Sequence, residues 1–418
     1  MSVSGEEKKL NIPHALVAMA ITMAMYVVLC VVCGITPFGD STWISYDMKR
    51  QYVDFYSYYK QLISGNTNLF YSLSTALGSG TIGFWTYYLA SPFLFIIALF
   101  PNQLMPLAIT IVIGLKLACA SLTMDVFLQK FCGKSAYICA VTYGFCGFVI
   151  ANAMNIMWLD VIIIMPIVIL MAERLLHGGK LMGYIIAVAV MLFLNYYIAY
   201  MVLIFVILWF VVRLVAERVK SPTQAIFRLG MATVAAAGID AILLIPTFIE
   251  IKNSPSDIVD DSRVVQHIGV NLRQILTKLF SMSYDSIQIY WGAPMLFCGL
   301  AMVALVLLYF VNKKIPLKER LSMLVMLILF IVSFMSENLN LLWHAGTEPS
   351  GYLFREAIMC VFVLIICACR SLQFMREGIT WTRFGVVTLM ITMAMCYAFK
   401  TPESYMDGWK IWLNIAEF

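Results

Sequence analysis

The chain has 418 residues, of which 62% are hydrophobic and only 12% are charged. A soluble domain is roughly half apolar and about a quarter charged, so this composition excludes an ordinary soluble protein. The charges gather in short clusters between continuous apolar runs of about 17–25 residues, the length that crosses a bilayer as a helix. The net charge of +5 resides in those connecting clusters and does not indicate binding to nucleic acid.

Five basic clusters predict the orientation of the spans, because Lys and Arg accumulate in the short cytoplasmic loops of membrane proteins. The clusters lie at 130–134, 174–180, 213–228, 313–320 and 370–383. Placing them all inside leaves one arrangement of about 11 spans, with the N-terminus in the cytoplasm and the C-terminus outside. The expected spans are 12–35, 106–129, 136–153, 157–173, 181–197, 198–216, 226–249, 291–311, 320–336, 354–371 and 381–398. The external segments are then 36–105, 250–290, 337–353 and 399–418.

For two apolar runs, length alone does not decide whether they cross the membrane in the mature protein. The first, 12–35, is too long for the core of a signal peptide and lacks a small-residue cleavage site, so we expect it to remain as the first span. The run 84–100 is nearly long enough to cross, but a crossing would move every later basic cluster outside. We therefore interpret it as a re-entrant or interfacial helix bounded by Pro92 and Pro101, with an outright span as the alternative.

The first external segment carries the densest polar and aromatic chemistry. Its pattern predicts a helix from Asp47 to Ile63, whose aromatic side chains recur at helical spacing. We expect this stripe to lie in the membrane interface, where amphipathic rings prefer to sit. The stripe consists of Tyr52, Phe55, Tyr56 and Tyr59.

Asp47 is the leading candidate for a catalytic carboxylate. It lies just after the first span and shares a helix face with Gln51, four residues on. Aromatic and amide groups beside it, such as Tyr52, are suited to holding a sugar. The alternative is a helix-terminal acid that only complements the helix dipole.

Two further groups lie at predicted outer ends of spans. Asp160 follows Trp158 in the run MNIMWLD and is interpreted either as a second acidic group of the external site or as a carboxylate near a helix end. A tight external turn then contains Asn195, Tyr196 and Tyr197, which either line the same cavity or belong to the ordinary aromatic belt.

Arg355 opens a predicted span on its outer side, against the usual inside bias of Arg. A planar fork of donors suits a phosphate, and His344 is close in sequence. The alternative is a salt bridge with Glu348 or Glu356. Deeper in the spans, we expect Lys116 and Asp240 to pair, because an isolated charge within a bilayer is costly.

Several chemistries leave no trace in this sequence. It contains no phosphate-binding G-x-x-x-x-G-K-[ST] loop, no HExxH zinc motif and no G-x-S-x-G nucleophile elbow. The eleven cysteines, including the close pairs Cys30–Cys33 and Cys367–Cys369, lie almost entirely in apolar runs and are interpreted as small hydrophobes. We therefore predict no metal site and no cofactor.

The chain resembles the bacterial YfhO membrane-protein family over most of its length. The residues that carry the resemblance occur in the same order along the chain. They are Tyr46-Asp47 with Gln51-Tyr52 and Phe55, Gly78-Ser79-Gly80, the run Tyr87 to Pro92, the run Asn155 to Asp160 with Pro166, the run Asn195 to Met201, and Trp343-His344 with Pro349 and Phe354-Arg355.

That family is similar to GT-C glycosyltransferases. The resemblance implies a GT-C-like module at 1–249, followed by a second part at 250–418 that holds an external loop and the last helices. It also implies transfer of a sugar from a polyprenyl-phosphate carrier to a teichoic-acid-like polymer on the outer face of the bacterial plasma membrane. The expected partners are thus the lipid-linked sugar, the polymer and membrane lipids, with no nucleic acid.

On this hypothesis Asp47 is the general base of an inverting transfer, Asp160 positions hydroxyl groups, and Arg355 holds the leaving phosphate. The other predicted substrate contacts are Gln51, Tyr52, Trp158, Asn195, Tyr196, Tyr197 and His344. The alternatives are a transporter or flippase of polyprenyl lipids or small solutes, and an inactive scaffold for other envelope enzymes. Inverted repeats typical of transporters are not evident.

Overall fold

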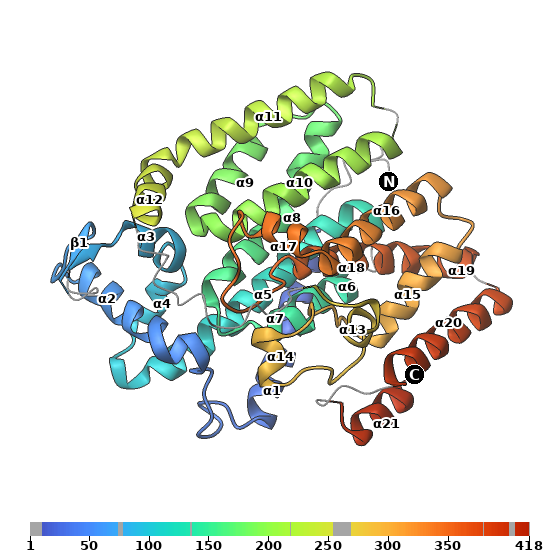
Figure 1. The fold of residues 1–418 in the computed structure, drawn as a ribbon, viewed down its shortest axis with the longest axis horizontal. Helices are drawn as coiled ribbons and strands as arrows, with labels where there is room; N and C mark the ends of the chain where they lie inside the picture. The colour runs from blue at the N-terminus through green and yellow to red at the C-terminus, as the bar shows by residue number, and fades with distance from the viewer. Residues whose placement is uncertain are drawn as a thin grey trace.

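The computed structural model describes residues 11–73, 78–133, 136–217, 219–253, 269–378, 380–400 and 406–417. These parts of the chain are almost entirely helical, which confirms the predicted all-α class (Figure 1). Within them the strands are β1 (Tyr71–Ser72) and β2 (Ser79–Gly80), a two-residue antiparallel pair in the first predicted external segment. Part of the predicted external loop 250–290 lies outside the described residues.

Each predicted span corresponds to at least one helix, because a continuous apolar run satisfies its backbone hydrogen bonds internally only as a helix. Two of the runs are divided between consecutive helices. The helices are α1 (Ile12–Val32), α5 (Met105–Cys132), α6 (Ala136–Gly144) with α7 (Gly147–Ala151), α8 (Ile156–Leu176), α9 (Leu181–Leu194), α10 (Tyr196–Ala216), α11 (Pro222–Ile239) with α12 (Ala241–Asn253), α15 (Leu300–Val311), α16 (Leu317–Met335), α18 (Ala357–Gln373) and α20 (Trp381–Phe399).

Among the described residues, five helices are long and apolar enough to cross a membrane, or up to seven if each bent pair forms one span. The bent pairs are α11 with α12, at 76°, and α16 with α17 (Glu337–Trp343), at 104°. The remaining apolar helices, including α9, α15 and α18, have 10–17 residues. The chain is thus a multi-span helical bundle, whereas the number of about 11 complete crossings stays a prediction.

The ambiguous run 84–100 is broken into short pieces. It contains the end of α3 (Ile82–Phe84), the π-helix η2 (Trp85–Leu89) and α4 (Leu94–Leu99), and the helix breaks around Pro92. Six helical residues reach only about 9 Å, against a hydrocarbon core of about 30 Å. This geometry favours the re-entrant interpretation over an outright span.

The aromatic stripe of the first external segment is buried inside the protein, so the expectation that it lies in the membrane interface is wrong. It begins in the π-helix η1 (Met48–Tyr52) and continues in α2 (Val53–Ile63). Tyr52, Tyr56 and Tyr59 are each at most 4% exposed. The re-entrant segment covers them and supplies Tyr88, whose ring centroid lies 4.8 Å from that of Phe55.

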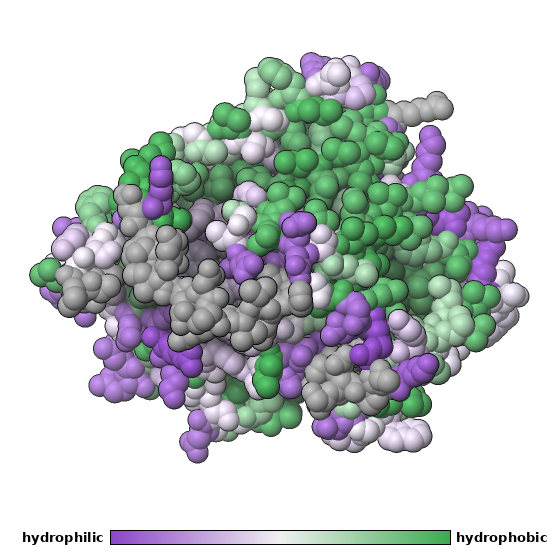
Figure 2. All heavy atoms as spheres, in the orientation of Figure 1, coloured by the Kyte–Doolittle hydropathy of each residue, from purple (hydrophilic) through white to green (hydrophobic). Residues whose placement is uncertain are grey.

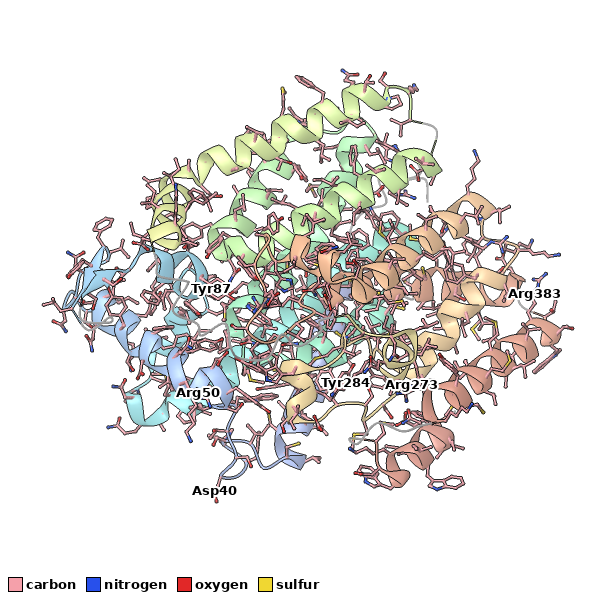
Figure 3. The ribbon with its side chains drawn as sticks, viewed as in Figure 1. Asp40, Arg50, Tyr87, Arg273, Tyr284 and Arg383 are labelled. Carbon is pink, nitrogen blue, oxygen red and sulfur yellow. The ribbon has the colours of Figure 1, made fainter. Side chains whose placement is uncertain are left out.

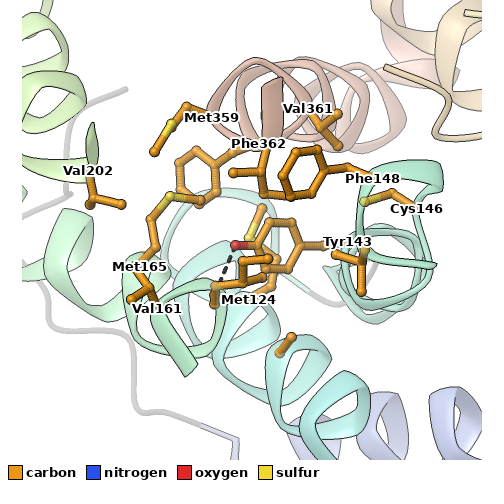
Figure 4. Close-up of a cluster of buried hydrophobic side chains, with 14 of the residues drawn as sticks. Met124, Tyr143, Cys146, Phe148, Val161, Met165, Val202, Met359, Val361 and Phe362 are labelled. Atoms are coloured by element: carbon orange, nitrogen blue, oxygen red, sulfur yellow. Dashed lines mark hydrogen bonds between the residues drawn. The ribbon is translucent and has the colours of Figure 1, made fainter. Parts of the chain in front are cut away.

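The core of the bundle forms where α18 packs against α6 and α5 (Figure 4). The Phe362 ring lies 5.0 Å from that of Phe127 and 6.1 Å from that of Tyr143. The Tyr143 hydroxyl donates to the carbonyl oxygen of Ile162 at 2.9 Å, so this buried polar atom is satisfied.

Lys116 and Asp160 form a buried ion pair in the bundle. The Lys116 ammonium, 0% exposed, lies 2.6 Å from Asp160, and the expected pairing of Lys116 with Asp240 is not formed. Asp160 is the nearer partner because α5 packs directly on α8. Each ion is expensive to bury alone, which makes pairing the stable arrangement.

The later external segments are folded onto the bundle. They contain α13 (Leu272–Thr277) and α14 (Ser286–Trp291), while α19 (Met375–Gly378) lies in a basic loop. The tail, for which no helix was predicted, forms α21 (Gly408–Glu417). Asn414 of α21 accepts from the Ser281 amide at 2.8 Å and donates to its carbonyl oxygen at 3.0 Å. Trp412, 71% exposed, is of the type that anchors in a membrane interface.

Polar residues gather at the two ends of the molecule's long axis. Arg50 and Tyr87, from the first predicted external segment, lie at one side, and Arg383 of a basic loop lies at the other (Figure 3). Hydrophobic side chains spread over the region of α10, α11 and α16 between these ends (Figure 2). This distribution is the one expected of a bilayer-spanning protein with its basic loops on one face.

Candidate active site

Asp47 occupies a half-buried position immediately before η1. Its carboxylate makes no capping hydrogen bond to the helix, so both the catalytic interpretation and the helix-dipole alternative stay predictions. Burial raises the pKa of Asp47, although the positive charges of Arg50 and Arg355 act in the opposite direction. A carboxylate with a raised pKa is a better proton acceptor than an ordinary aspartate.

Arg355 provides a positive charge that makes no ion pair with any described residue. Its guanidinium donates to the carbonyl oxygens of Tyr352 at 3.3 Å and Gly351 at 3.1 Å. It also lies over two rings, 5.2 Å from the centroid of Trp158 and 5.0 Å from that of Tyr197. Cation–π contacts of this kind hold a guanidinium in place and leave its charge unneutralised.

The salt bridge considered for Arg355 is not formed. Among the described residues no carboxylate lies within 4 Å of it, and both carboxylate oxygens of Glu356 are buried without a hydrogen-bond partner. Glu348 is exposed. Arg355 instead lies close enough to Asp47 for its positive charge to favour the ionised form of that carboxyl group.

A chain of aromatic contacts connects the Asp47 loop with Arg355. The ring of Tyr46 stacks on Tyr290 at 6.4 Å, Tyr290 contacts Tyr352 at 4.7 Å, and Tyr352 meets Trp158 edge-on at 5.3 Å. The Tyr352 amide also donates to the Tyr290 carbonyl oxygen at 2.6 Å. The segment containing α14 therefore joins the two functional loops.

Two of these tyrosines have unusual backbone conformations. Tyr46, directly before Asp47, has φ 47°, and Tyr352, three residues before Arg355, has φ 53°. Such left-handed conformations cost of order 1–3 kcal/mol in a bulky residue and cluster at functional sites. The strain fixes the directions in which the two loops approach each other.

A small hollow of about 20 Å³, room for about one water molecule, lies beside Arg355. Its wall includes Trp158 and Tyr352, together with Gln288 of α14 and Asn152. Asn152 is 2% exposed, yet its side-chain oxygen has no hydrogen-bond partner. A buried acceptor without a partner beside a hollow is a place where a ligand hydroxyl gains a hydrogen bond.

Tyr87 of the re-entrant segment organises one side of the site. Its hydroxyl accepts from the indole nitrogen of Trp158 at 3.0 Å, and its ring lies 6.1 Å from Tyr196 and 6.0 Å from Tyr197. Its carbonyl oxygen accepts from the Asn195 amide at 3.0 Å. The re-entrant segment therefore positions the two rings that hold Arg355.

Asn195 is fully buried and uses both of its amide atoms within the protein. The side-chain oxygen accepts from the Ile198 amide at 2.9 Å and caps α10, while the nitrogen donates to Tyr87. Asn195 thus acts on the site through Tyr87, and direct contact with a sugar stays a prediction.

Asp160 has the most closely defined surroundings of the predicted site residues. It is 2% exposed and accepts from Lys116 at 2.6 Å and from the Ser91 hydroxyl at 3.0 Å. Lys116 in turn donates to the Ile156 carbonyl oxygen at 3.0 Å. This arrangement gives Asp160 a structural role beneath the re-entrant segment, and its contact with substrate stays a prediction.

The remaining predicted substrate contacts differ in their exposure. Gln51 is exposed, whereas the Tyr52 hydroxyl is buried and donates to Asn155 at 3.0 Å. His344 is fully buried, its ring lies 6.3 Å from that of Tyr197, and its Nε2 has no partner. Burial lowers the pKa of His344 to about 4, which keeps it neutral near pH 7.

Sequence reasoning missed Asn152, Gln288, Tyr290 and Tyr352. The last two are ordinary aromatics of segments predicted to be external loops, and no spacing connects 290 with 46 along the chain. Of the four, Asn152 has the clearest signal in the sequence, because it lies just before the run MNIMWLD, which contains predicted site residues. Among the described residues, no three His, Cys, Asp or Glu side chains are grouped closely enough to hold a metal ion.

Comparisons with known proteins agree with this architecture. The family model described as bacterial membrane protein YfhO matches residues 18–416. No curated protein matches the sequence. The fold is similar to a cryo-EM structure of the arabinofuranosyltransferase AftD from Mycobacteria, with a TM-score of 0.54 and 14% identity over 91% of this chain. The similarity spans only 27% of that longer chain. The protein therefore belongs to the YfhO family of bacterial multi-span membrane proteins.

Proposed function

We propose that this protein is a membrane glycosyltransferase that moves a sugar from a polyprenyl-phosphate donor to a cell-surface polymer on the outer face of the membrane. The observation that carries the proposal is an acid, Asp47, within electrostatic reach of Arg355, a cation held over two aromatic rings and without an ion pair among the described residues. The family match and the fold shared with an arabinofuranosyltransferase support the same class of reaction.

Asp47 supplies the base. The acceptor hydroxyl attacks the anomeric carbon from the face opposite the donor phosphate, and its proton passes to the Asp47 carboxylate as the new C–O bond forms. The bond between the anomeric carbon and the phosphate oxygen breaks, and its electron pair leaves with the phosphate. The product has inverted configuration at that carbon.

Arg355 stabilises the negative charge that develops on the leaving phosphate. The leaving polyprenyl phosphate gains negative charge as its bond to the sugar lengthens, and a fixed guanidinium stabilises that charge without reorganising. The stacking of Arg355 between Trp158 and Tyr197 leaves part of its donor fork available for phosphate oxygens. Because phosphate is already an acidic leaving group, no general acid is needed.

An apolar groove of about 470 Å³ supports a lipid-linked donor. One face of α16 lines it over 18 residues, a length of roughly 26 Å, and the lining side chains recur every three or four positions. At its predicted outer end, Phe334 contacts Phe354 edge-on at 5.8 Å, directly before Arg355. A prenyl chain in the groove would bring its phosphate to Arg355. The lining side chains from α16 are Leu317, Arg320, Leu321, Leu324, Leu327, Ile331 and Phe334.

The acceptor is proposed to be a teichoic-acid-like polymer, on the basis of the family resemblance and the predicted external position of the site. The small hollow beside Arg355 offers the side-chain oxygen of Asn152 as a hydrogen-bond acceptor, next to the rings of Trp158 and Tyr352. Such a combination of rings and amides suits a sugar hydroxyl face.

The test compares surface polymers from cells that lack the protein with those from cells that express wild type, Asp47→Asn or Asp54→Asn. Asp54 is an exposed acid of the same helical segment and serves as the matched control. We expect the sugar content to be restored by wild type and by Asp54→Asn, and the transfer rate of Asp47→Asn to fall by about 10²–10⁴. Near-normal transfer by Asp47→Asn, at equal protein level, would remove Asp47 from the base role.

The lipid chain has a separate test. Ile331→Trp fills the groove, whereas Leu329→Trp adds the same bulk on the exposed side of α16, where Leu329 is 41% exposed. We expect Ile331→Trp to raise the KM for the lipid-linked donor and Leu329→Trp to leave it unchanged. Equal KM values would show that the donor chain lies elsewhere.

A transporter remains the alternative, and one observation favours it. The helix breaks between α11 and α12 at Asp240, which is 6% exposed and has an unpartnered carboxylate oxygen. Broken helices with buried charges occur at transport sites. Uptake of the lipid or solute into proteoliposomes, without any change in sugar linkage, would favour transport over transfer.

A further inference from the structure

A second hollow, of about 440 Å³, lies far from Arg355, between the end of α8 and the beginning of α11. The structure brings together two basic clusters that are separate in sequence, 174–180 and 213–228. Arg228 donates to the Gly179 carbonyl oxygen, and His177 lies 3.0 Å from Glu217. The polar lining consists of His177, Gly178, Lys220, Ser221, Gln224 and Arg228.

The charge of this hollow is positive. Lys220 and Arg228 line it, and the hydrogen bond with Glu217 raises the pKa of His177, which also lines it. No carboxylate lines it within the described chain, and the nearby Glu217 already accepts hydrogen bonds from His177 and Arg213. The acid near the hollow is thus engaged, while Lys220 is exposed.

Exposed apolar side chains of α10 and α11 lie close in sequence to the residues that line the hollow. Val215 is 81% exposed, Ile226 53% and Phe227 64%. In Figure 1, α11 forms the outer edge of the bundle, and Figure 2 shows hydrophobic side chains over this region. In a bilayer-spanning protein such side chains contact lipid tails, because no other helix covers them in the described chain.

We propose that this hollow binds the headgroup of an anionic phospholipid of the cytoplasmic leaflet. A diffusible anion would need only the cationic lining, whereas the tails of a phospholipid also gain contact with the exposed apolar side chains of α10 and α11, among them Val215, Ile226 and Phe227. The position follows from the basic loops, which are predicted to be cytoplasmic. Basic pockets between transmembrane helices on that side bind acidic headgroups, and each cation near an anionic surface contributes about 1 kcal/mol.

The experiment measures binding of dioleoyl phosphatidylglycerol to the purified full chain by native mass spectrometry, with dioleoyl phosphatidylcholine as the neutral comparison. Lys220→Gln removes one exposed cation, and Gln224→Glu places a negative charge in the same lining. Lys314→Gln removes an exposed cation from another basic loop and is the matched control. Glycerol phosphate, added as a competitor, distinguishes a soluble anion from a lipid.

We expect phosphatidylglycerol to bind more tightly than phosphatidylcholine, and Lys220→Gln to weaken it about fivefold. Gln224→Glu should weaken it as well, Lys314→Gln should not, and glycerol phosphate should not compete at concentrations comparable to the lipid. Equal binding of the two lipids, equal loss in Lys220→Gln and Lys314→Gln, or full competition by glycerol phosphate would overturn the proposal.

Discussion

The Asp160→Asn substitution distinguishes a structural from a catalytic role for this buried acid. In the wild type, the Lys116 ammonium has three partners: Asp160 at 2.6 Å, the Ser91 hydroxyl at 2.9 Å and the Ile156 carbonyl oxygen at 3.0 Å. At an effective dielectric constant of about 20, two charges at this separation attract by roughly 6 kcal/mol. Desolvation of both ions offsets part of that attraction.

Removing one partner leaves the other charge buried, and such changes cost about 3–5 kcal/mol of stability. We therefore expect Asp160→Asn to lower the free energy of unfolding by this amount, measured by equilibrium unfolding in mixed detergent micelles. The double variant Lys116→Met/Asp160→Leu removes both charges and should recover most of the loss. Surface-polymer sugar content is measured for each variant at equal protein level.

The reasoning would be refuted if Asp160→Asn unfolds like wild type but transfers no sugar. That result would show that Asp160 contacts substrate and that its ion pair with Lys116 contributes little. A double variant as unstable as Asp160→Asn would also contradict it, because the cost would then come from lost packing rather than from the stranded charge.

Three further predictions concern the site itself. Arg355→Lys keeps the charge but loses the planar fork held between Trp158 and Tyr197, so we expect transfer to fall about 100-fold in an in vitro assay; an unchanged rate would exclude a specific phosphate contact. Burial raises the pKa of Asp47, and a general base must be deprotonated. The transfer rate should therefore fall with decreasing pH, at a midpoint above the pKa of an ordinary aspartate, which is about 4. A midpoint at or below that pKa would contradict the assignment. The pKa of His344 is lowered to about 4, whereas an unfolded His titrates near 6.5. The free energy of unfolding should therefore fall by up to about 3 kcal/mol as the pH decreases from 6.5 to 4, because the unfolded state takes up the proton first. His344→Leu should abolish this contribution to the pH dependence of stability.

The local features of the chain could be read from the sequence because they depend on short stretches. Apolar length predicted the positions of the helices, and Pro92 marked the break that divides the run 84–100. The basic clusters predicted which loops share a side, and Arg355 stood out as a cation on the opposite one. Asp47 was selected by its place after the first span, and its role as a base stays a prediction.

Only the tertiary structure decided which partners these residues have. The sequence pattern of Tyr52, Tyr56 and Tyr59 fits an interfacial helix and a buried one equally well, and the re-entrant segment that covers them resolves the choice. Lys116 and Asp160 are 44 positions apart, so no spacing rule connects them. The periodicity of a helix follows from backbone geometry within a few residues, whereas side-chain pairing depends on which helices pack together. The sequence by itself therefore determined a multi-span helical membrane protein with an acid and an arginine predicted outside, and the packing decided that Arg355 is stacked between two rings, free of any ion pair within the described chain.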